Sequence, residues 1–101
     1  MSLTIRILRP SSTEYPNILK KNIKDIQKIA KVLYEDLKKN KDWPYTSSDI
    51  SSRAKALNKA LQEKNSKIIW CARGGYGASD LLPYINWDKL KNQNPKLIIG
   101  F

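Results

Sequence analysis

The sequence contains no histidine and only one cysteine, Cys71. A single cysteine cannot form a disulfide within the chain, and a zinc site built from cysteine and histidine ligands is excluded. These residues cannot complete a Ser-His-Asp triad or a Cys-His pair either. Cys71 is therefore interpreted as a small apolar residue inside a strand, because no histidine is available to activate its thiol. We expect no metal and no cofactor.

Long hydrophobic runs are also missing, and none approaches the roughly 20 residues of a membrane-spanning helix. The N-terminal stretch MSLTIRILRPSS alternates apolar with polar residues and is too short for the core of a signal peptide. These absences predict a cytoplasmic protein without a membrane partner. With 101 residues and a hydrophobic fraction of 41%, the chain can form one domain with a modest core.

Acidic residues are few, since nine Asp and Glu stand against 19 Lys and Arg, which gives a net charge of +10. Such an excess favours anionic partners. The positive residues are mostly scattered lysines, however, and cluster only at Lys20-Lys21 and at 38–41. Without a recognisable nucleic-acid motif, this pattern favours a solvated lysine-rich surface. A small basic module that binds an anionic ligand or nucleic acid stays as the alternative function.

Hydrophobic periodicity predicts strands that alternate with helices. We expect strands at 3–8, 68–72 and 96–99, and helices at 16–30, at 48–63, near 78–83 and after 86. Residues 31–37 fit either a continued helix or a short strand, and periodicity does not decide between them. Ser47 or Ser48 is predicted to cap the second long helix, with Asp49 in its first turn. The order predicts an α/β fold, a Rossmann-like three-layer lobe with a mostly parallel sheet.

Glycine is scarce as well, yet three of the four glycines follow the apolar run 68–72 directly, in Arg73-Gly74-Gly75-Tyr76-Gly77. Ligands of open parallel sheets bind outside the carboxyl ends of the strands. Glycines there let the backbone approach a ligand, and the next helix directs free N–H groups toward it. Such a turn can bind a phosphate, a carboxylate or a developing oxyanion. A tight turn without a ligand explains the same pattern, and a GxGxxG or Walker motif is not present.

The stretch IIWCARGGYGASDLLPYINWDKL, together with NPKLIIGF, resembles the LD-carboxypeptidase family and its microcin C self-immunity relatives. Pro10-Ser11-Ser12 after the first strand is similar to the Ala-Pro-Ser segment of that family, although Arg9 replaces its alanine. Asp49, Arg53-Ala54 and Leu57-Asn58 resemble the family's helix before the motif strand. The resemblance is dense over residues 46–101 and loose over 3–45.

This resemblance implies a serine-type carboxypeptidase, a hydrolase that removes a terminal D-residue from murein tetrapeptides of the peptidoglycan cell wall. It implies that Gly74 or Gly75 donates an oxyanion-hole N–H, and that Arg73, Tyr76 and Gly77 contact the substrate. A purely structural role fits Arg73 equally well, and packing is the more common role for an aromatic residue at the position of Tyr76. Ser11, Ser12 and Ser79 are interpreted as turn and cap residues.

Family members are about three times as long, and their nucleophilic serine directly follows the segment that corresponds to Gly100-Phe101. We therefore expect residues 1–101 to be an incomplete, truncated N-terminal domain with no catalytic residue of its own, and to be inactive alone. The expected partners are a murein-derived peptide and either a C-terminal half or further copies of the chain. The apolar strand 96–101 should lie uncovered at a sheet edge, which favours self-association.

Overall fold

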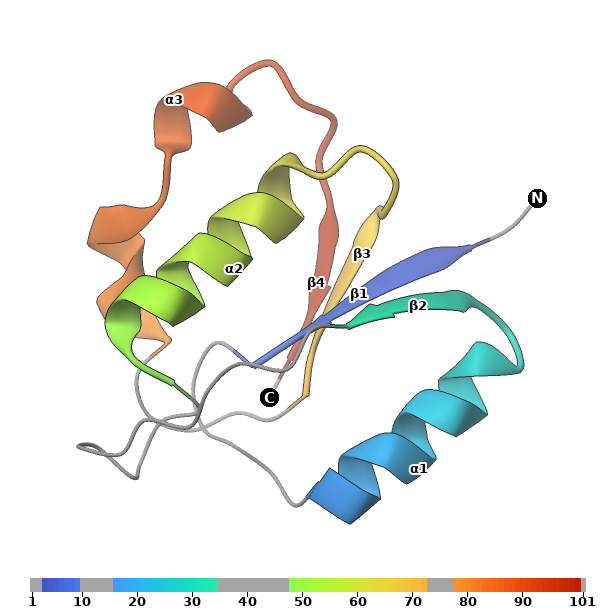
Figure 1. The fold of residues 1–101 in the computed structure, drawn as a ribbon. Coiled ribbons are helices and arrows are strands. Elements are labelled where there is room, and N and C mark those ends of the chain that lie inside the picture. The colour runs from blue at the N-terminus through green and yellow to red at the C-terminus, as the bar shows by residue number, and fades with distance from the viewer. Residues whose placement is uncertain (1–2, 10–15, 35–47, 73–77, 101) are drawn as a thin grey trace.

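The computed structural model describes residues 3–9, 16–34, 48–72 and 78–100. Their elements follow the order β1 (Thr4–Leu8), α1 (Pro16–Gln27), β2 (Lys31–Tyr34), α2 (Ile50–Gln62), β3 (Ile68–Cys71), η1 (Ser79–Tyr84), α3 (Trp87–Leu90) and β4 (Leu97–Ile99). The four strands form one sheet in the order β2-β1-β3-β4, and each neighbouring pair is parallel. Figure 1 shows α1 and α2 on different sides of this sheet, which gives three layers. The predicted α/β fold with a mostly parallel sheet is confirmed.

Two small cores lie on the two faces of the sheet, because successive side chains of a strand point to opposite faces. Ile5 and Ile7 of β1 pack with Leu19 of α1 on one face. Leu8 packs with Ala60 of α2 and with Ile69 of β3 on the other. Ile69 is fully buried, and burial of a side chain of this size stabilises a fold by about 1.5–3 kcal/mol. The central strands β1 and β3 therefore carry most of the apolar packing.

α1 ends three residues earlier than predicted, and the next residues form a turn into β2. Ile29 donates its N–H to the carbonyl of Ile26 at 3.0 Å, and Lys31 donates to the carbonyl of Leu3 at 2.7 Å. The turn places Ile29 outside the helix, where it is 76% exposed instead of belonging to the apolar face. Lys31–Tyr34 then pairs in parallel with β1, so the strand alternative for this segment is the correct one.

α2 begins one residue later than the sequence suggests, because Asp49 itself is the N-cap. Its carboxylate accepts a hydrogen bond from the backbone N–H of Ser52 at 2.6 Å. The prediction of a serine cap was wrong for Ser48, and Ser47 lies outside the described residues. Aspartate serves this position well since it satisfies a free N–H and adds negative charge at the positive end of the helix.

η1 and α3, which lie between β3 and β4 in the chain, pack along α2 on one face of the molecule (Figure 1). The side-chain amide of Asn58 donates to the carbonyl of Tyr84 and accepts from the N–H of Asn86, both at 2.9 Å. η1 ends at Tyr84, directly after Pro83, near which it was predicted to stop. Pro83 cannot donate, and the turn continues because Ile85 donates instead to the carbonyl of Leu82. No helix within the described ranges is long and apolar enough to cross a membrane.

A side-chain network joins β1, α2, β3 and β4 at the amino edge of the sheet. Arg6 binds the carboxylate of Glu63 through both Nε, at 3.1 Å, and Nη2. Ser66 donates its hydroxyl to the same carboxylate at 2.8 Å. Because Arg6 donates to this carboxylate, the pKa of Glu63 lies below its ordinary value. The network thus fixes the end of α2 against the central strand.

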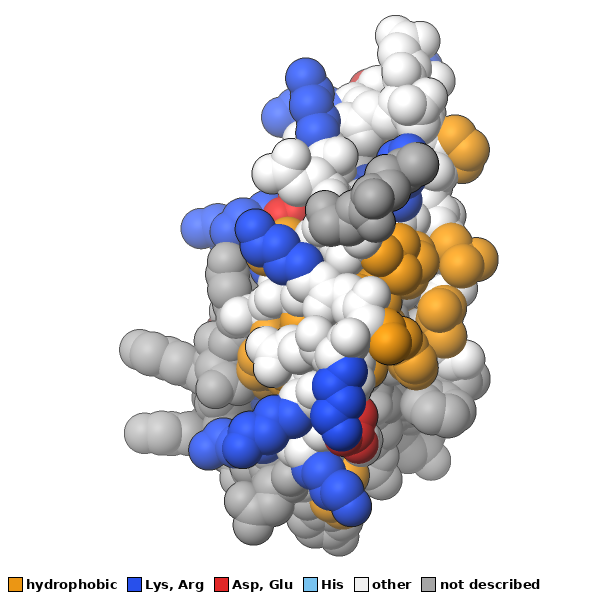
Figure 2. Space-filling model, turned by 90° about the vertical axis from the view of Figure 1, so that its right-hand side faces the viewer, with side chains coloured by type: hydrophobic (Ala, Val, Ile, Leu, Met, Phe, Trp, Pro, Cys, Tyr) orange, Lys and Arg blue, Asp and Glu red, His pale blue; other side chains and the backbone are white. Residues whose placement is uncertain are grey.

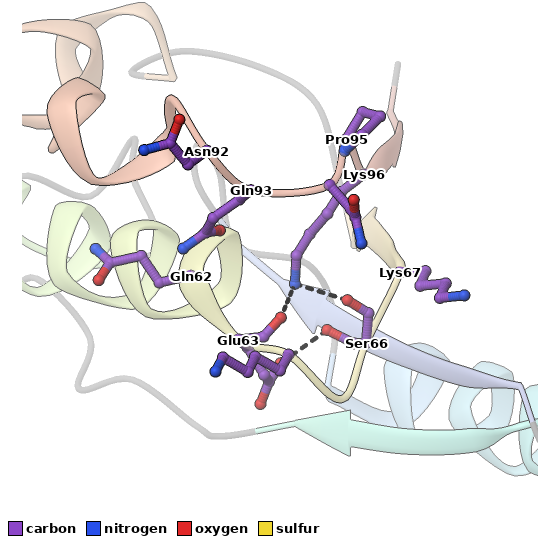
Figure 3. Close-up of a pocket in the computed structure, with 10 residues that line it drawn as sticks. Gln62, Glu63, Ser66, Lys67, Asn92, Gln93, Pro95 and Lys96 are labelled. Atoms are coloured by element: carbon purple, nitrogen blue, oxygen red, sulfur yellow. Dashed lines mark hydrogen bonds between the residues drawn. The ribbon is translucent and has the colours of Figure 1, made fainter.

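Lys96, directly before β4, closes this edge from the other side (Figure 3). Its ammonium group donates to the carbonyls of Ala60 at 2.8 Å, Ser66 at 2.6 Å and Glu63. These carbonyls lie at and just beyond the C-terminal end of α2, where a positive charge is favourable. Burial lowers the pKa of Lys96, an effect that the nearby Glu63 carboxylate opposes. Lys96 therefore sets the start of β4 relative to α2 and β3.

Candidate functional site at the carboxyl edge of the sheet

The carboxyl edge of the sheet collects the ends of all four strands, because the strands are parallel. β1 ends there at Leu8, β2 at Tyr34, β3 at Cys71 and β4 at Ile99. α2 begins at the same edge with its Asp49 cap. The predicted site residues 73–77 lie outside the described residues, as do Ser11 and Ser12. The roles expected for Arg73, Gly74, Gly75, Tyr76 and Gly77 therefore stay predictions, and the site is built from the residues around them.

The glycine segment is bracketed by two residues with defined backbone contacts. Ala72 donates its N–H to the carbonyl of Leu8 at 2.8 Å, so the β1–β3 ladder continues one residue past Cys71. On the other side, Ala78 has helical dihedral angles (φ −64°, ψ −42°), and its carbonyl accepts from Leu81 at 3.1 Å. Leu81 is fully buried and anchors η1 against the rest of the protein. Both ends of the five-residue segment are thus held by packed elements.

Cys71 lies beside Gly100, where β3 and β4 end together. A Cβ atom added to Gly100 would lie 3.7 Å from both Cβ and Sγ of Cys71, an ordinary van der Waals distance. Burial raises the pKa of the Cys71 thiol, which favours the neutral, unreactive form. This environment agrees with the expectation that Cys71 is a packing residue and not a nucleophile, although its side chain is half-buried. β4 therefore ends beside Cys71, which lies shortly before the glycine segment in the chain.

Arg9 and Tyr34 form a contact at this edge that sequence reasoning missed. The Arg9 guanidinium carbon lies 5.9 Å from the centre of the Tyr34 ring, within the range of a cation–π interaction. Arg9 follows β1 and Tyr34 ends β2, so the two residues meet because neighbouring parallel strands end at one edge. The sequence did not decide whether residues 31–37 form a helix or a strand, so the contact between Arg9 and Tyr34 was not predicted. A guanidinium group therefore stands at the carboxyl edge, on the β2 side.

Arg53 places a second guanidinium group near the start of α2, and it is 3% exposed. Its Nε donates to the carbonyl of Ser48 at 2.8 Å, which ties the segment before α2 to the helix. Burial lowers the pKa of Arg53, while the charges of Asp80 and Asp49 act in the opposite direction. Asp80 belongs to the first turn of η1. Arg53 therefore ties the residues before α2 to that helix through its hydrogen bond, and it interacts with η1 through the charge of Asp80.

One described hollow lies away from this edge. It has a volume of about 540 Å³ and lies at the amino edge, between the end of α2 and the turn before β4 (Figure 3). Glu63, Ser66 and Lys96 line it, and their polar groups are bonded to one another and to backbone carbonyls. Such groups are occupied in holding the fold together. We therefore assign the candidate site to the carboxyl edge, on the position of the glycine segment between β3 and η1.

Comparison with protein families gives a match over residues 5–101 to the LD-carboxypeptidase N-terminal domain. The murein tetrapeptide carboxypeptidase of Pseudomonas aeruginosa is 34% identical over 59 residues, which are 58% of this chain and 19% of that protein. The chain thus spans only a part of the curated relatives it matches.

Solved structures show the same relation. A structure of the microcin C7 self immunity protein matches 99% of this chain and 30% of its own length, with a TM-score of 0.84 and 26% identity. The muramoyltetrapeptide carboxypeptidase of Oxalobacter formigenes matches 94% of this chain and 31% of its own length. Its TM-score is 0.77 at 22% identity, so it supports the fold alone.

Proposed function

Because the chain belongs to the LD-carboxypeptidase family through its N-terminal domain, we propose that it supplies the oxyanion-binding turn and part of the pocket wall of a serine carboxypeptidase acting on murein tetrapeptides. The family match over residues 5–101 carries this proposal, because it includes β3 and the glycine segment that follows it. The position of that segment after a parallel strand, before a helix, also supports it.

In this mechanism the backbone N–H of Gly74 or Gly75 donates to the oxygen of the tetrahedral intermediate. A preorganised donor is effective here because it meets negative charge that develops only as the carbonyl is attacked. Arg73 pairs with a carboxylate of the peptide, and Tyr76 and Gly77 line the pocket. Arg9 at the same edge supports an anionic substrate, since its guanidinium makes the electrostatic potential there more positive, whereas the charges of Asp80 and Asp49 oppose that of Arg53.

The attacking serine and its glutamate and histidine come, in this proposal, from polypeptide outside residues 1–101. The chain alone is then inactive, because loss of the nucleophile and its base removes several orders of magnitude in rate. The test measures release of D-alanine from a murein tetrapeptide by the purified chain, with the intact Pseudomonas aeruginosa relative as the positive control. Turnover by the chain alone at the level of that control would overturn the proposal.

The oxyanion role is tested with this chain combined with the polypeptide that supplies the serine, the glutamate and the histidine. Gly74→Pro and Gly75→Pro each remove one N–H, and loss of an oxyanion-hole donor typically lowers kcat by about 10²–10³-fold. Tyr76→Phe, which keeps every backbone donor, serves as the control. Folding of each variant is checked by its thermal midpoint. If both proline variants fold and keep the parental kcat, neither N–H is the donor.

A further inference from the structure

The outward side of α1 carries a row of lysines. Leu19 is buried and packs the helix against β1. Lys21, Lys24 and Lys28 recur at steps of three and four residues, and all three are exposed. At 3.6 residues per turn, Lys21 and Lys24 lie on the side of α1 that faces away from Leu19 and from the sheet. Lys28, in the turn directly after α1, continues the row, because its N–H still donates to the carbonyl of Asp25 at 3.3 Å.

Positive charge is concentrated on this side of the fold. Residues 16–34, which include α1 and β2, hold five Lys and one Asp, whereas residues 78–92, which include η1 and α3, hold two of each. The one acid, Asp25, lies 3.6 Å from Lys28, and both side chains are more than half exposed, so water solvates their ion pair. Lysines that are scattered along the sequence are thus brought together by the fold.

Apolar side chains stand exposed beside these lysines. Ile29 is 76% exposed, the highest value among the large hydrophobic side chains of the described residues. Lys31 donates its N–H to the carbonyl of Leu3 at 2.7 Å, which holds the half-exposed Leu3 close to the turn that carries Ile29. Ile18, in the first turn of α1, is exposed as well. Figure 2 looks onto the side where Figure 1 places the turn between α1 and β2, and it shows Lys and Arg side chains next to hydrophobic ones.

Three occupants compete for this surface: an anionic bilayer, a nucleic acid and a second copy of the chain. A second copy is disfavoured because each copy carries a net charge of +10, and like charges repel. Nucleic acids are held through their phosphates and, in single strands, through aromatic side chains that stack on bases, whereas the exposed apolar residues here are Ile and Leu. A bilayer accommodates both kinds of side chain, since lysines attract its anionic headgroups and aliphatic side chains enter the layer beneath them.

We propose that this surface, which we call the basic face, binds the headgroup region of an anionic phospholipid bilayer. The basic face consists of Leu3, Ile18, Lys21, Lys24, Lys28 and Ile29. The expectation of no membrane partner rested on the lack of a spanning segment, and binding in the plane of the interface needs none. The inference goes beyond the proposed function and does not depend on it, because the basic face belongs to α1 and its neighbours and not to the glycine segment.

The experiment sediments the purified chain with vesicles of phosphatidylcholine that contain about 30% phosphatidylserine. We expect binding at low ionic strength, release at about 0.5 M salt because salt screens the charges, and no binding to vesicles of phosphatidylcholine alone. The double variant Lys21→Glu/Lys24→Glu should weaken binding at least about tenfold. Lys64→Glu/Lys67→Glu is the matched control, because it makes the same change in net charge at two exposed lysines outside the basic face, and it should keep most of the affinity.

The apolar part of the basic face has its own variant. Ile29→Ser should weaken binding by about three- to tenfold, because a side chain that enters the interface is lost. Leu82→Ser, which removes an exposed side chain of η1, should leave binding unchanged. Thermal midpoints check that each variant folds.

A second measurement uses the unmodified chain and so does not depend on the folding of a variant. With vesicles present, Lys21, Lys24 and Lys28 should be acetylated more slowly, whereas Lys64 and Lys67 should react at unchanged rates. The inference is overturned if the chain does not bind the anionic vesicles at low ionic strength, if the two double variants weaken binding equally, or if protection falls evenly on all lysines.

The competing occupants give distinct results. Binding to an oligonucleotide that is tighter than binding to vesicles and withstands Ile29→Ser would overturn the inference and assign the basic face to nucleic acid. A dimer of the chain that protects the same lysines without vesicles would overturn it in favour of a second copy.

Discussion

At the amino edge of the sheet, Arg6, Glu63, Ser66 and Lys96 join four elements through charged hydrogen bonds, whereas the described side-chain contacts of the carboxyl edge stay near the start of α2 or join β1 to β2. At the carboxyl edge the Arg9 guanidinium carbon lies 5.9 Å from the centre of the Tyr34 ring. A Cβ atom added to Gly100 would lie at an ordinary van der Waals distance from Cys71. The residues that tie the fold together are thus concentrated away from the glycine segment. Ligand-binding loops are commonly carried by a rigid scaffold whose stabilising contacts lie elsewhere in the fold. Substitutions at the amino edge should therefore lower the free energy of unfolding more than substitutions at the carboxyl edge.

The largest effect is expected from Arg6→Met at the amino edge. The Arg6 and Glu63 side chains are 10% and 15% exposed, so loss of one partner leaves a poorly solvated charge. We expect the free energy of unfolding to fall by about 3 kcal/mol, measured by urea denaturation. Lys28→Met is the control, because its partner Asp25 is 58% exposed and the ion pair stabilises little. Equal destabilisation by both substitutions would show that the buried ion pair contributes no more to the free energy of unfolding than the exposed one.

Lys96→Met should have the next largest effect. The substitution keeps the length of the side chain but removes the donor for three backbone carbonyls. We expect a loss of about 2 kcal/mol in the free energy of unfolding. Lys91→Met, at a lysine that is 72% exposed and bound to Asp88, should leave that free energy unchanged. A Lys96→Met protein as stable as the parent would refute the anchoring role.

Acid should weaken the contact between Arg6 and Glu63 at the amino edge. The folded-state pKa of Glu63 lies below its ordinary value of 4.5, chiefly because Arg6 donates to it. The unfolded state therefore binds more protons, so this contribution is present above about pH 4.5 and is lost as the pH falls through the folded-state pKa. Urea midpoints between pH 6 and 3 should fall less steeply for Glu63→Gln.

The carboxylate of Asp49, whose pKa is also lowered by its bond to Ser52, should account for part of the remaining slope. Asp49→Asn, which keeps an N-cap acceptor, separates this contribution from that of Glu63. Parallel pH profiles for the parent and Glu63→Gln would contradict the assignment.

The smallest effect is expected at the carboxyl edge, from Gly100→Ala. The added Cβ would meet Cys71 at 3.7 Å and so fits without rearrangement. We expect the free energy of unfolding to change by less than about 0.5 kcal/mol, measured by urea denaturation. Gly100→Val, which adds bulk toward the same neighbour, should be the less stable of the two. A large loss with alanine would mean that the end of β4 is as tightly built as its start.

The sequence was sufficient for the order of strands and helices because periodicity and turn residues report local structure. It predicted β1, β3 and β4 within a residue or two, and it left residues 31–34 undecided because four residues are too few to distinguish the periods of a helix and a strand. The serine cap was wrong because Ser47, Ser48 and Asp49 are all good cap residues, and tertiary packing selects among them.

Long-range contacts could not be predicted in this way. Arg6 and Glu63 are 57 positions apart, and one sequence holds no signal that pairs them. The same is true of Arg9 and Tyr34, which meet only because β2 is a strand beside β1. The motif at 73–77 was visible since it is local. Its chemistry depends on neighbours that come from other elements, and the prediction of self-association likewise depends on which partners are present.

The anchoring of Lys96 has a consequence for the geometry of the whole domain. Three residues separate this ammonium group from Gly100, and side chains alternate along them. Deleting one of them would turn Gly100 to the opposite face of the sheet, and would rotate by half a turn the direction in which the backbone leaves the layer. The direction of the backbone at the carboxyl edge is thus set by a cation seated on a helix end at the opposite edge.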